Sequence, residues 1–272
     1  MPAVLSPQLI ALFASLIEDV AGLHYGAHDR DLFAAKLSAH AADVGEDNLL
    51  DYYYRLRYDD PGGEQLQRLI EALVVHESYF FREQAPLMQL VDTQIAPAVR
   101  ASGRVRVWSA ACATGEEPYT LAMILDQRGL LEQVEIVATD ISAAAIERAR
   151  RGRHSARSLR DGHPKDVAAR YLEVSPGGVI VSPRIRERVR FSVVNLLDDA
   201  AVERLGMFEA ILCRNVLIYF QDRCATTVIE HLARRLTRDG LLVVGVSESL
   251  LRLGTQLRCE ERGGSFFYRS AR

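Results

Sequence analysis

Short apolar runs that alternate with helix-like segments fill the chain from about residue 104, and they constrain its fold most strongly. The runs cover residues 105–110, 134–139, 208–213 and 241–246, each with the length of a buried strand. Buried strands that alternate with helices predict a parallel sheet covered by helices on both faces. The sequence therefore predicts an α/β domain.

The first of these runs leads into a turn that contains Gly115, and a helix is expected from Glu116. Because glycine has no Cβ, a strand, a glycine turn and a helix in this order let the backbone approach a nucleotide-like ligand. Many α/β domains contain such a turn, so this signal alone leaves the ligand open.

Polar residues follow two further runs. Asp140 ends the second run, where a carboxylate accepts hydrogen bonds from both hydroxyls of a ribose; the alternative is an N-cap for a helix that starts at Ser142. Arg214, Asn215 and Tyr219 follow the third run, at the sheet edge where ligands bind. The alternative there is that Asn215 caps a turn and Tyr219 lies in the core.

The N-terminal part of the chain shows helical periodicity instead. Ser6 and Pro7 fit an N-cap and a first helical residue, and apolar residues recur at helical spacing in 9–20, 31–42, 48–56 and 66–74. We therefore expect a helical domain with its linker over residues 1–84 and the α/β domain over residues 85–272. Within the latter, a polar stretch with apolar runs at 179–181 and 189–193 predicts a small β-subdomain insertion at 174–193, with a long surface loop as the alternative.

The chain carries the segments HESYFFRE (76–83), WSAACATGEEPY (108–119), CRNVLIYF (213–220) and GVSES (245–249). Their order and spacing resemble those of the CheR-type chemotaxis receptor methyltransferases over essentially the whole chain. The resemblance implies a Rossmann-like class I S-adenosylmethionine-dependent methyltransferase fold with an N-terminal helical domain and a small β-subdomain insertion. It also implies methyl transfer from S-adenosylmethionine to glutamate side chains of a chemoreceptor or receptor-like signalling protein, giving a methyl ester and S-adenosylhomocysteine.

The resemblance assigns site residues as well. It implies that the cofactor is surrounded by Ser78, Arg82, Ala111, Glu117, Asp140, Asn195, Leu196, Arg214 and Asn215. Asp140 takes the ribose in this assignment, and Asn195 and Leu196 lie near the adenine. Arg82 and Tyr219 are the expected catalytic residues, which position or polarise the reactants; contact of Arg82 with the carboxylate of the cofactor is an open alternative.

Composition limits the partners. The formal net charge of −3 gives no indication of a nucleic-acid substrate. The four cysteines are widely spaced and lack companion histidines at ligand spacing, so no metal site is expected. No apolar stretch has the ~18 residues that a membrane span needs. These features favour a cytoplasmic protein without membrane insertion, and we expect a monomer.

The receptor-facing surface departs from the family pattern. Residues 36–43 stand where receptor-modifying members have an arginine-rich helix face, yet only Lys36 and His40 are basic there. A candidate replacement surface for an acidic protein partner, with a solvated helix face as the alternative, consists of Arg148, Arg150, Arg151, Arg153, Arg157, Arg160, Arg184, Arg186, Arg188 and Arg190. Two other functions also remain open: methylation of a different carboxylate acceptor, and a regulatory module that binds the cofactor without turnover.

Overall fold

The computed structural model describes residues 6–270 and divides the chain into two compact units between Val75 and His76. The segment Tyr219–Ala225 belongs to the N-terminal unit, and the remaining residues from His76 onward form the second unit. The domain boundaries expected from the sequence, residues 1–84 and 85–272, are not tested by this division into compact units and stay a prediction.

The N-terminal unit is helical, as the periodicity predicts. Its helices are α1 (Pro7–Ala21), α2 (Arg30–Asp43), α3 (Leu49–Tyr58) and α4 (Glu64–Leu73). Ser6 caps α1 by accepting a hydrogen bond from the Leu9 amide at 3.2 Å, and Gly22 ends this helix with a φ of 74°. Inside the unit, the His40 Nε2 and Tyr52 hydroxyl groups lie 2.9 Å apart, and Phe13 and Phe33 are fully buried.

A seven-stranded sheet forms the centre of the second unit, in the order β6-β2-β1-β7-β8-β10-β9. Its parallel strands are β1 (Val105–Ala110), β2 (Val134–Asp140), β6 (Val189–Val193), β7 (Phe208–Cys213) and β8 (Leu236–Val244). The antiparallel pair β9 (Leu257–Arg262) and β10 (Ser265–Ser270) completes one edge. The expectation of an α/β domain with a mostly parallel sheet is confirmed.

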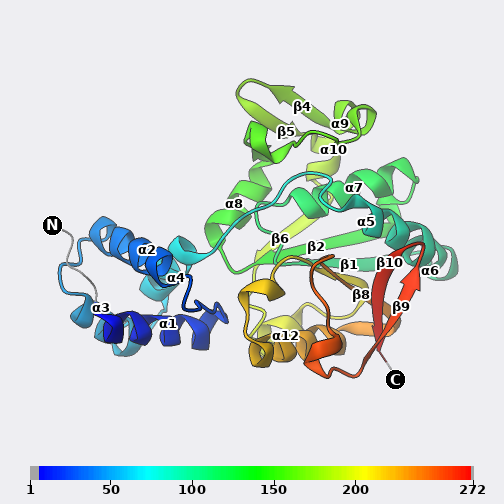
Figure 1. Ribbon diagram of the computed structural model, residues 1–272. Coiled ribbons are helices and arrows are strands. Elements are labelled where there is room, and N and C mark those ends of the chain that lie inside the picture. The colour runs from blue at the N-terminus through cyan, green and yellow to red at the C-terminus, as the bar shows by residue number, and fades with distance from the viewer. Residues whose placement is uncertain (1–5, 271–272) are drawn as a thin grey trace. The chain divides into compact units, whose positions relative to one another are not determined.

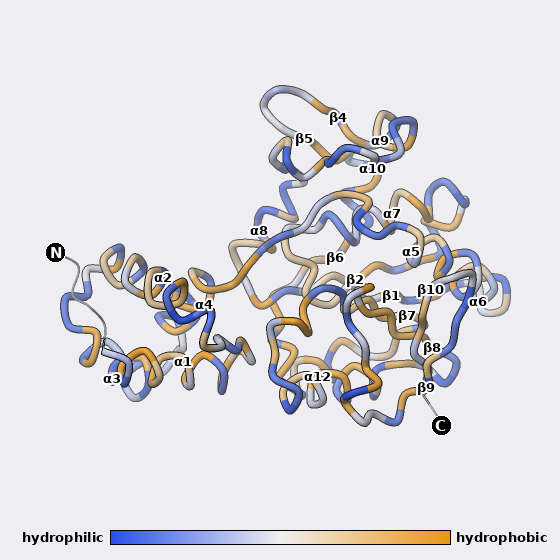
Figure 2. Tube along the Cα trace, viewed as in Figure 1, coloured by the Kyte–Doolittle hydropathy of each residue, from blue (hydrophilic) through white to orange (hydrophobic). Residues whose placement is uncertain are grey.

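Helices cover both faces of this sheet. Figure 1 shows α5 (Gln84–Leu90), α6 (Ala96–Ser102) and α7 (Glu116–Gln127) along one face and the part of α12 (Asp222–Arg234) from Thr226 onward along the other. Strands β1, β2 and β7 are buried almost throughout, and hydrophobic residues follow their traces in Figure 2. The unit also contains the helices α8 (Ala143–Arg151), α9 (Lys165–Tyr171), α10 (Pro183–Arg186) and α11 (Asp199–Arg204).

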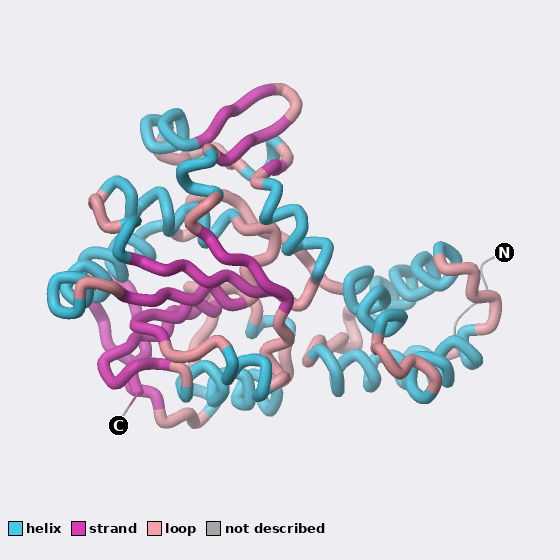
Figure 3. Tube along the Cα trace, turned by 180° about the vertical axis from the view of Figure 1, so that it is seen from behind, coloured by secondary structure: helices cyan, strands magenta, loops and turns pink. Residues whose placement is uncertain are grey.

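A second, three-stranded antiparallel sheet stands apart from the main one (Figure 3). It consists of β3 (Arg153–His154), β4 (Leu172–Ser175) and β5 (Gly178–Val181) in the order β3-β5-β4. The segment expected as an insertion, 174–193, is therefore shared between two sheets, because β6 pairs with β2 in the main sheet. Val189 and Phe191 of β6 are buried in the main sheet, while Val179 and Val181 of β5 are buried in the small one.

Candidate active site

The turn between β1 and α7 has an unusual backbone. Ala111 and Ala113 adopt φ values of 58° and 48°, and Gly115 adopts 95°. Left-handed backbone at a residue with a Cβ is disfavoured and is found mainly where the surrounding structure imposes it, often at functional sites. Gly115 has a packing reason too, because a Cβ there would lie 2.9 Å from the Ala149 Cβ on α8.

Asp140 ties this turn to the end of β2. Its carboxylate accepts hydrogen bonds from the Ala113 amide at 2.8 Å and the Ser142 amide at 3.0 Å. Burial raises the pKa of Asp140, and the backbone N–H groups of Ser142 and Ala113 partly offset this effect. Ser142, whose hydroxyl accepts from the Ala145 amide, is the N-cap of α8, so the alternative role of Asp140 as the cap is wrong.

Asn195 and Leu196 follow β6 next to this carboxylate. The Val194 amide donates to the Asp140 carbonyl at 2.9 Å, so the segment continues the β2–β6 pairing past the end of the sheet. The Asn195 side chain accepts from the Leu197 amide, while the Leu196 carbonyl lies 2.9 Å from His231 Nδ1. These contacts fix the segment beside Asp140, and its place near the adenine stays a prediction.

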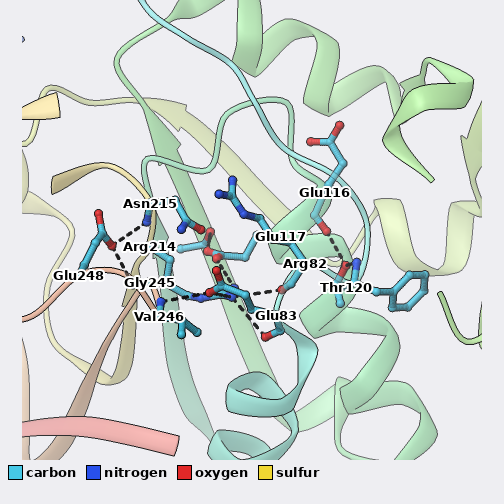
Figure 4. A network of polar contacts seen from close by, with 12 residues as sticks. Arg82, Glu83, Glu116, Glu117, Thr120, Arg214, Asn215, Gly245, Val246 and Glu248 are labelled. Atoms are coloured by element: carbon cyan, nitrogen blue, oxygen red, sulfur yellow. Dashed lines mark hydrogen bonds and ion pairs between the residues drawn. The ribbon is translucent and has the colours of Figure 1, made fainter. Parts of the chain in front are cut away.

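Arg214 is the centre of a buried ionic network at the end of β7 (Figure 4). Its side chain is only 1% exposed, and its guanidinium donates to Glu117 Oε2 at 2.8 Å and to Glu83 Oε2 at 2.9 Å. The same group donates to the main-chain carbonyls of Arg82 and Glu83. Ser109 donates to the other oxygen of Glu117 at 2.7 Å, so both carboxylate oxygens have a fixed direction.

A second buried carboxylate, Glu248, organises the loop after β7. It accepts hydrogen bonds from the amides of Asn215 and Gly245 at 2.7 Å and from the amide of Leu217 at 2.8 Å. Asn215, whose φ is 59°, therefore takes a left-handed conformation in a loop that is pinned to the end of β8. The capping role considered for Asn215 is taken by the Glu248 side chain instead.

Arg82 comes from the segment before α5 and lies beside Tyr79. Its Nη1 donates to the Glu77 carbonyl at 3.0 Å, and its guanidinium carbon is 5.5 Å from the centroid of the Tyr79 ring. Within residues 6–270, the buried Nε of Arg82 has no hydrogen-bond partner. A buried donor of this kind favours a ligand acceptor nearby.

Tyr219 lies in the other unit. Its carbonyl accepts from the His24 amide at 2.8 Å, and the neighbouring Phe220 forms an isolated antiparallel bridge with Leu23. The sequence left open that Tyr219 lies in the core, but its side chain is only half-buried. Its catalytic assignment stays a prediction.

The sequence interpretation missed three carboxylates that the structure places at or beside the site: Glu83, Glu116 and Glu248. All three stand inside segments that resemble the family, so their position in a motif was the available signal. Glu116 pairs with His154, 38 residues away, and no local pattern identifies such a pair.

Comparisons with known proteins agree on one family. The family model described as CheR methyltransferase, SAM binding domain, matches residues 76–263. The chain is 38% identical over 210 residues to chemotaxis protein methyltransferase 2 of Vibrio cholerae, which covers 75% of this chain and 72% of the relative. It is 31% identical over 268 residues to chemotaxis protein methyltransferase 1 of Pseudomonas aeruginosa, covering 95% and 96% of the two chains.

Proposed function

Because the chain belongs to the CheR methyltransferase family, we propose that it transfers a methyl group from S-adenosylmethionine to glutamate side chains of a chemoreceptor or receptor-like signalling protein. The products are a glutamate methyl ester and S-adenosylhomocysteine. The observation that carries this function is the network in which Arg214 links Glu83 and Glu117 beside the left-handed turn 111–115.

The donor groups of the site suit S-adenosylmethionine. A carboxylate oxygen accepts more than one hydrogen bond, so Asp140 is able to bind ribose hydroxyls in addition to its backbone donors. Glu117, oriented by Ser109 and Arg214, offers a carboxylate to the ammonium of the methionyl part. Ser78, Arg82, Ala111, Asn195, Leu196 and Asn215 complete the proposed set.

No general base is required for the reaction. A glutamate side chain has an ordinary pKa of about 4.3, so the acceptor carboxylate is already ionised at neutral pH. When bound, S-adenosylmethionine supplies a methyl group on a positively charged sulfur. The carboxylate oxygen bonds to the methyl carbon, and the sulfur leaves as the neutral thioether of S-adenosylhomocysteine. The residues of this chain then act by alignment and exclusion of water, with Arg82 and Tyr219 positioning the acceptor.

The same proposal includes the setting of the enzyme. We expect it to act in the cytoplasm as a monomer and to bind no nucleic acid, in line with its net charge of −3. No helix in the part of the chain that the structure describes is long and apolar enough to cross a bilayer. Light scattering of the purified chain tests the monomer, since a dimer would double the mass of 30.3 kDa.

Methyl transfer to the cytoplasmic fragment of a chemoreceptor from the same genome tests the activity. With S-adenosylmethionine labelled in the methyl group, we expect base-labile label on the fragment and its loss when the acceptor glutamates are changed to alanine. Label on small carboxylates instead would assign a different acceptor. Binding of S-adenosylhomocysteine without any turnover would support the regulatory module and contradict the proposal.

The Arg82→Ala variant tests the positioning role. We expect kcat to fall about 10- to 100-fold, as for the loss of a charged hydrogen-bond donor, with a smaller change in the dissociation constant of S-adenosylhomocysteine. Arg190→Ala is the matched control, because that side chain is 78% exposed and pairs with Glu135 on the surface. An equal loss of cofactor affinity and kcat in Arg82→Ala would assign Arg82 to the cofactor.

A further inference from the structure

A polar pocket of about 310 Å³ opens beside the turn 111–115, entirely within the second unit. Ser78 and Thr114 contribute to its wall, which connects the pocket to the proposed cofactor site. Most of its other lining side chains are charged, and four of them are arginines: Arg148, Arg153, Arg157 and Arg160. An anionic group is therefore the natural occupant.

The two carboxylates of the pocket pair with only one of these four arginines among the described residues. Glu116 accepts hydrogen bonds from Thr114 and lies 3.1 Å from His154 Nδ1, and both side chains of that pair are 1% exposed. Glu77 pairs with Arg160 at 2.8 Å. Within the described residues 6–270, no ion pair or hydrogen bond is formed by the side chains of the other three arginines, Arg148, Arg153 and Arg157.

This separates the pocket from the wider arginine surface considered from the sequence. Arg184 donates to Asp126 at 3.0 Å through Nε, Arg188 pairs with Glu132, and Arg190 pairs with Glu135. Those side chains are already bound within the chain. Three arginines of the pocket, Arg148, Arg153 and Arg157, are still available to a partner.

The pocket also adjoins the proposed catalytic arginine. Two guanidinium groups lie near the Tyr79 ring, with Arg160 3.8 Å and Arg82 5.5 Å from its centroid. Glu77 connects the same two residues, since its carbonyl accepts from Arg82 and its carboxylate pairs with Arg160. When Arg82 holds the acceptor glutamate, acidic residues of the substrate that lie next to this glutamate are therefore within reach of the pocket.

We propose that this pocket binds carboxylate side chains that flank the acceptor glutamate in the substrate protein. The inference rests on the proposed function and adds a rule of substrate selection: an acidic segment around the methylated residue. Unpaired arginines next to the catalytic arginine provide the charge complementarity, and they act chiefly on substrate association. This replaces the electrostatic attraction that residues 36–43 do not provide.

The double variant Arg153→Gln with Arg157→Gln tests the pocket in the full-length enzyme. We expect the KM for the cytoplasmic receptor fragment to rise about fivefold to tenfold, as for the loss of two partly exposed ion pairs, with kcat little changed. The dissociation constant of S-adenosylhomocysteine should stay the same, which also shows that the variant is folded. The Arg153→Lys with Arg157→Lys variant keeps both charges and should retain the low KM.

Two matched controls sharpen the result. Arg104→Gln removes an exposed arginine of the second unit that lies outside both the pocket and the wider arginine surface, and it should leave KM unchanged. A receptor fragment whose acidic flanking residues are changed to glutamine should have the same KM with wild-type and double-variant enzyme. An unchanged KM of the double variant on the acidic fragment would overturn the pocket, whereas no labelling by the wild type would overturn the proposed function itself.

Discussion

The guanidinium of Arg214, at the end of β7, lies 2.9 Å from the carboxylate of Glu83, which comes from the segment just before α5. The same guanidinium reaches Glu117 on α7, so one buried cation joins three parts of the second unit. A buried charge is tolerated when it is paired and hydrogen-bonded, and its loss leaves its partners without compensation. The network therefore couples the stability of the fold to the shape of the site.

Replacing this cation should destabilise the protein strongly. For Arg214→Gln we expect the free energy of unfolding to fall by about 3 kcal/mol, because Glu83 and Glu117 would remain as neighbouring carboxylates without a counter-charge. Urea denaturation measures the change. Arg190→Gln, on an exposed arginine, should change the same quantity by less than about 0.5 kcal/mol, and an equal effect of the two variants would contradict the role of the network.

The ionisation of Glu83 gives this network a pH dependence. Burial alone would raise the pKa of Glu83, but the charge and hydrogen bond of Arg214, with the amide of Val246, hold it below the ordinary value of 4.5. A folded-state pKa below the unfolded value means that the stabilisation is complete above the ordinary pKa and is lost as the pH falls through the lower folded value.

The variant Glu83→Gln isolates this effect. The difference in unfolding free energy between wild type and variant should be largest at about pH 7 and should shrink below about pH 4.5. Denaturation at several pH values measures it. A difference that stays constant down to about pH 3 would show that Glu83 acts through packing and not through its charge.

The sequence predicts the sheet better than its edges. Strands β1, β2 and β7, and residues 241–244 of β8, are mostly apolar because both of their faces are buried, so composition alone identifies them. In contrast, β6 alternates between buried and exposed residues, which is why it resembled part of a peripheral sheet. Strand pairing depends on distant segments, and the antiparallel pair β9 and β10 left no comparable apolar run.

The site divides in the same way. Asp140 and Arg214 were accessible from the sequence because each follows a buried strand, and the end of a strand fixes where a side chain lies. The ionic role of Glu83 was not accessible in this way, since its partner Arg214 is 131 residues away and the left-handed backbone that directs Glu83 has no sequence signal. Tyr219 shows the opposite case, because its motif position is clear while its backbone belongs to the other unit.

Asp140 should control the affinity for the cofactor product. For Asp140→Asn we expect the dissociation constant of S-adenosylhomocysteine to rise about 10- to 100-fold, because charged hydrogen bonds to the ribose would be lost. Titration calorimetry measures it. Asp161→Asn, at an exposed residue of the same domain, is the control. Unchanged affinity in Asp140→Asn would remove Asp140 from the site.

Acidification should also weaken this binding in the wild type. Because burial raises the pKa of Asp140, protonation of the carboxylate begins at a higher pH than for an ordinary aspartate. The affinity for S-adenosylhomocysteine should therefore decline as the pH falls through that raised value, and the Asp140→Asn profile should lack this step. Parallel profiles of the two proteins would assign the titration to another group.

Two variants, Gly115→Ala and Gly129→Ala, separate the two energetic costs of adding a Cβ, which are backbone strain and overpacking. Both glycines have left-handed φ values, 95° and 68°, but a Cβ on Gly129 has nothing within 4 Å, whereas one on Gly115 would press against Ala149 and the Phe191 ring. Gly129→Ala should therefore show only the backbone effect of about 1 kcal/mol, while Gly115→Ala adds an overpacking effect of about 1–3 kcal/mol.

The two variants should differ in function as well as in stability. A shift of Ala149 and α8 away from Gly115 would displace the turn that Asp140 holds through the Ala113 amide, so S-adenosylhomocysteine should bind more weakly to Gly115→Ala and normally to Gly129→Ala. Calorimetry under conditions where both variants are folded measures this. Equal affinity in the two variants would mean that the close approach of α8 supports the fold without shaping the turn.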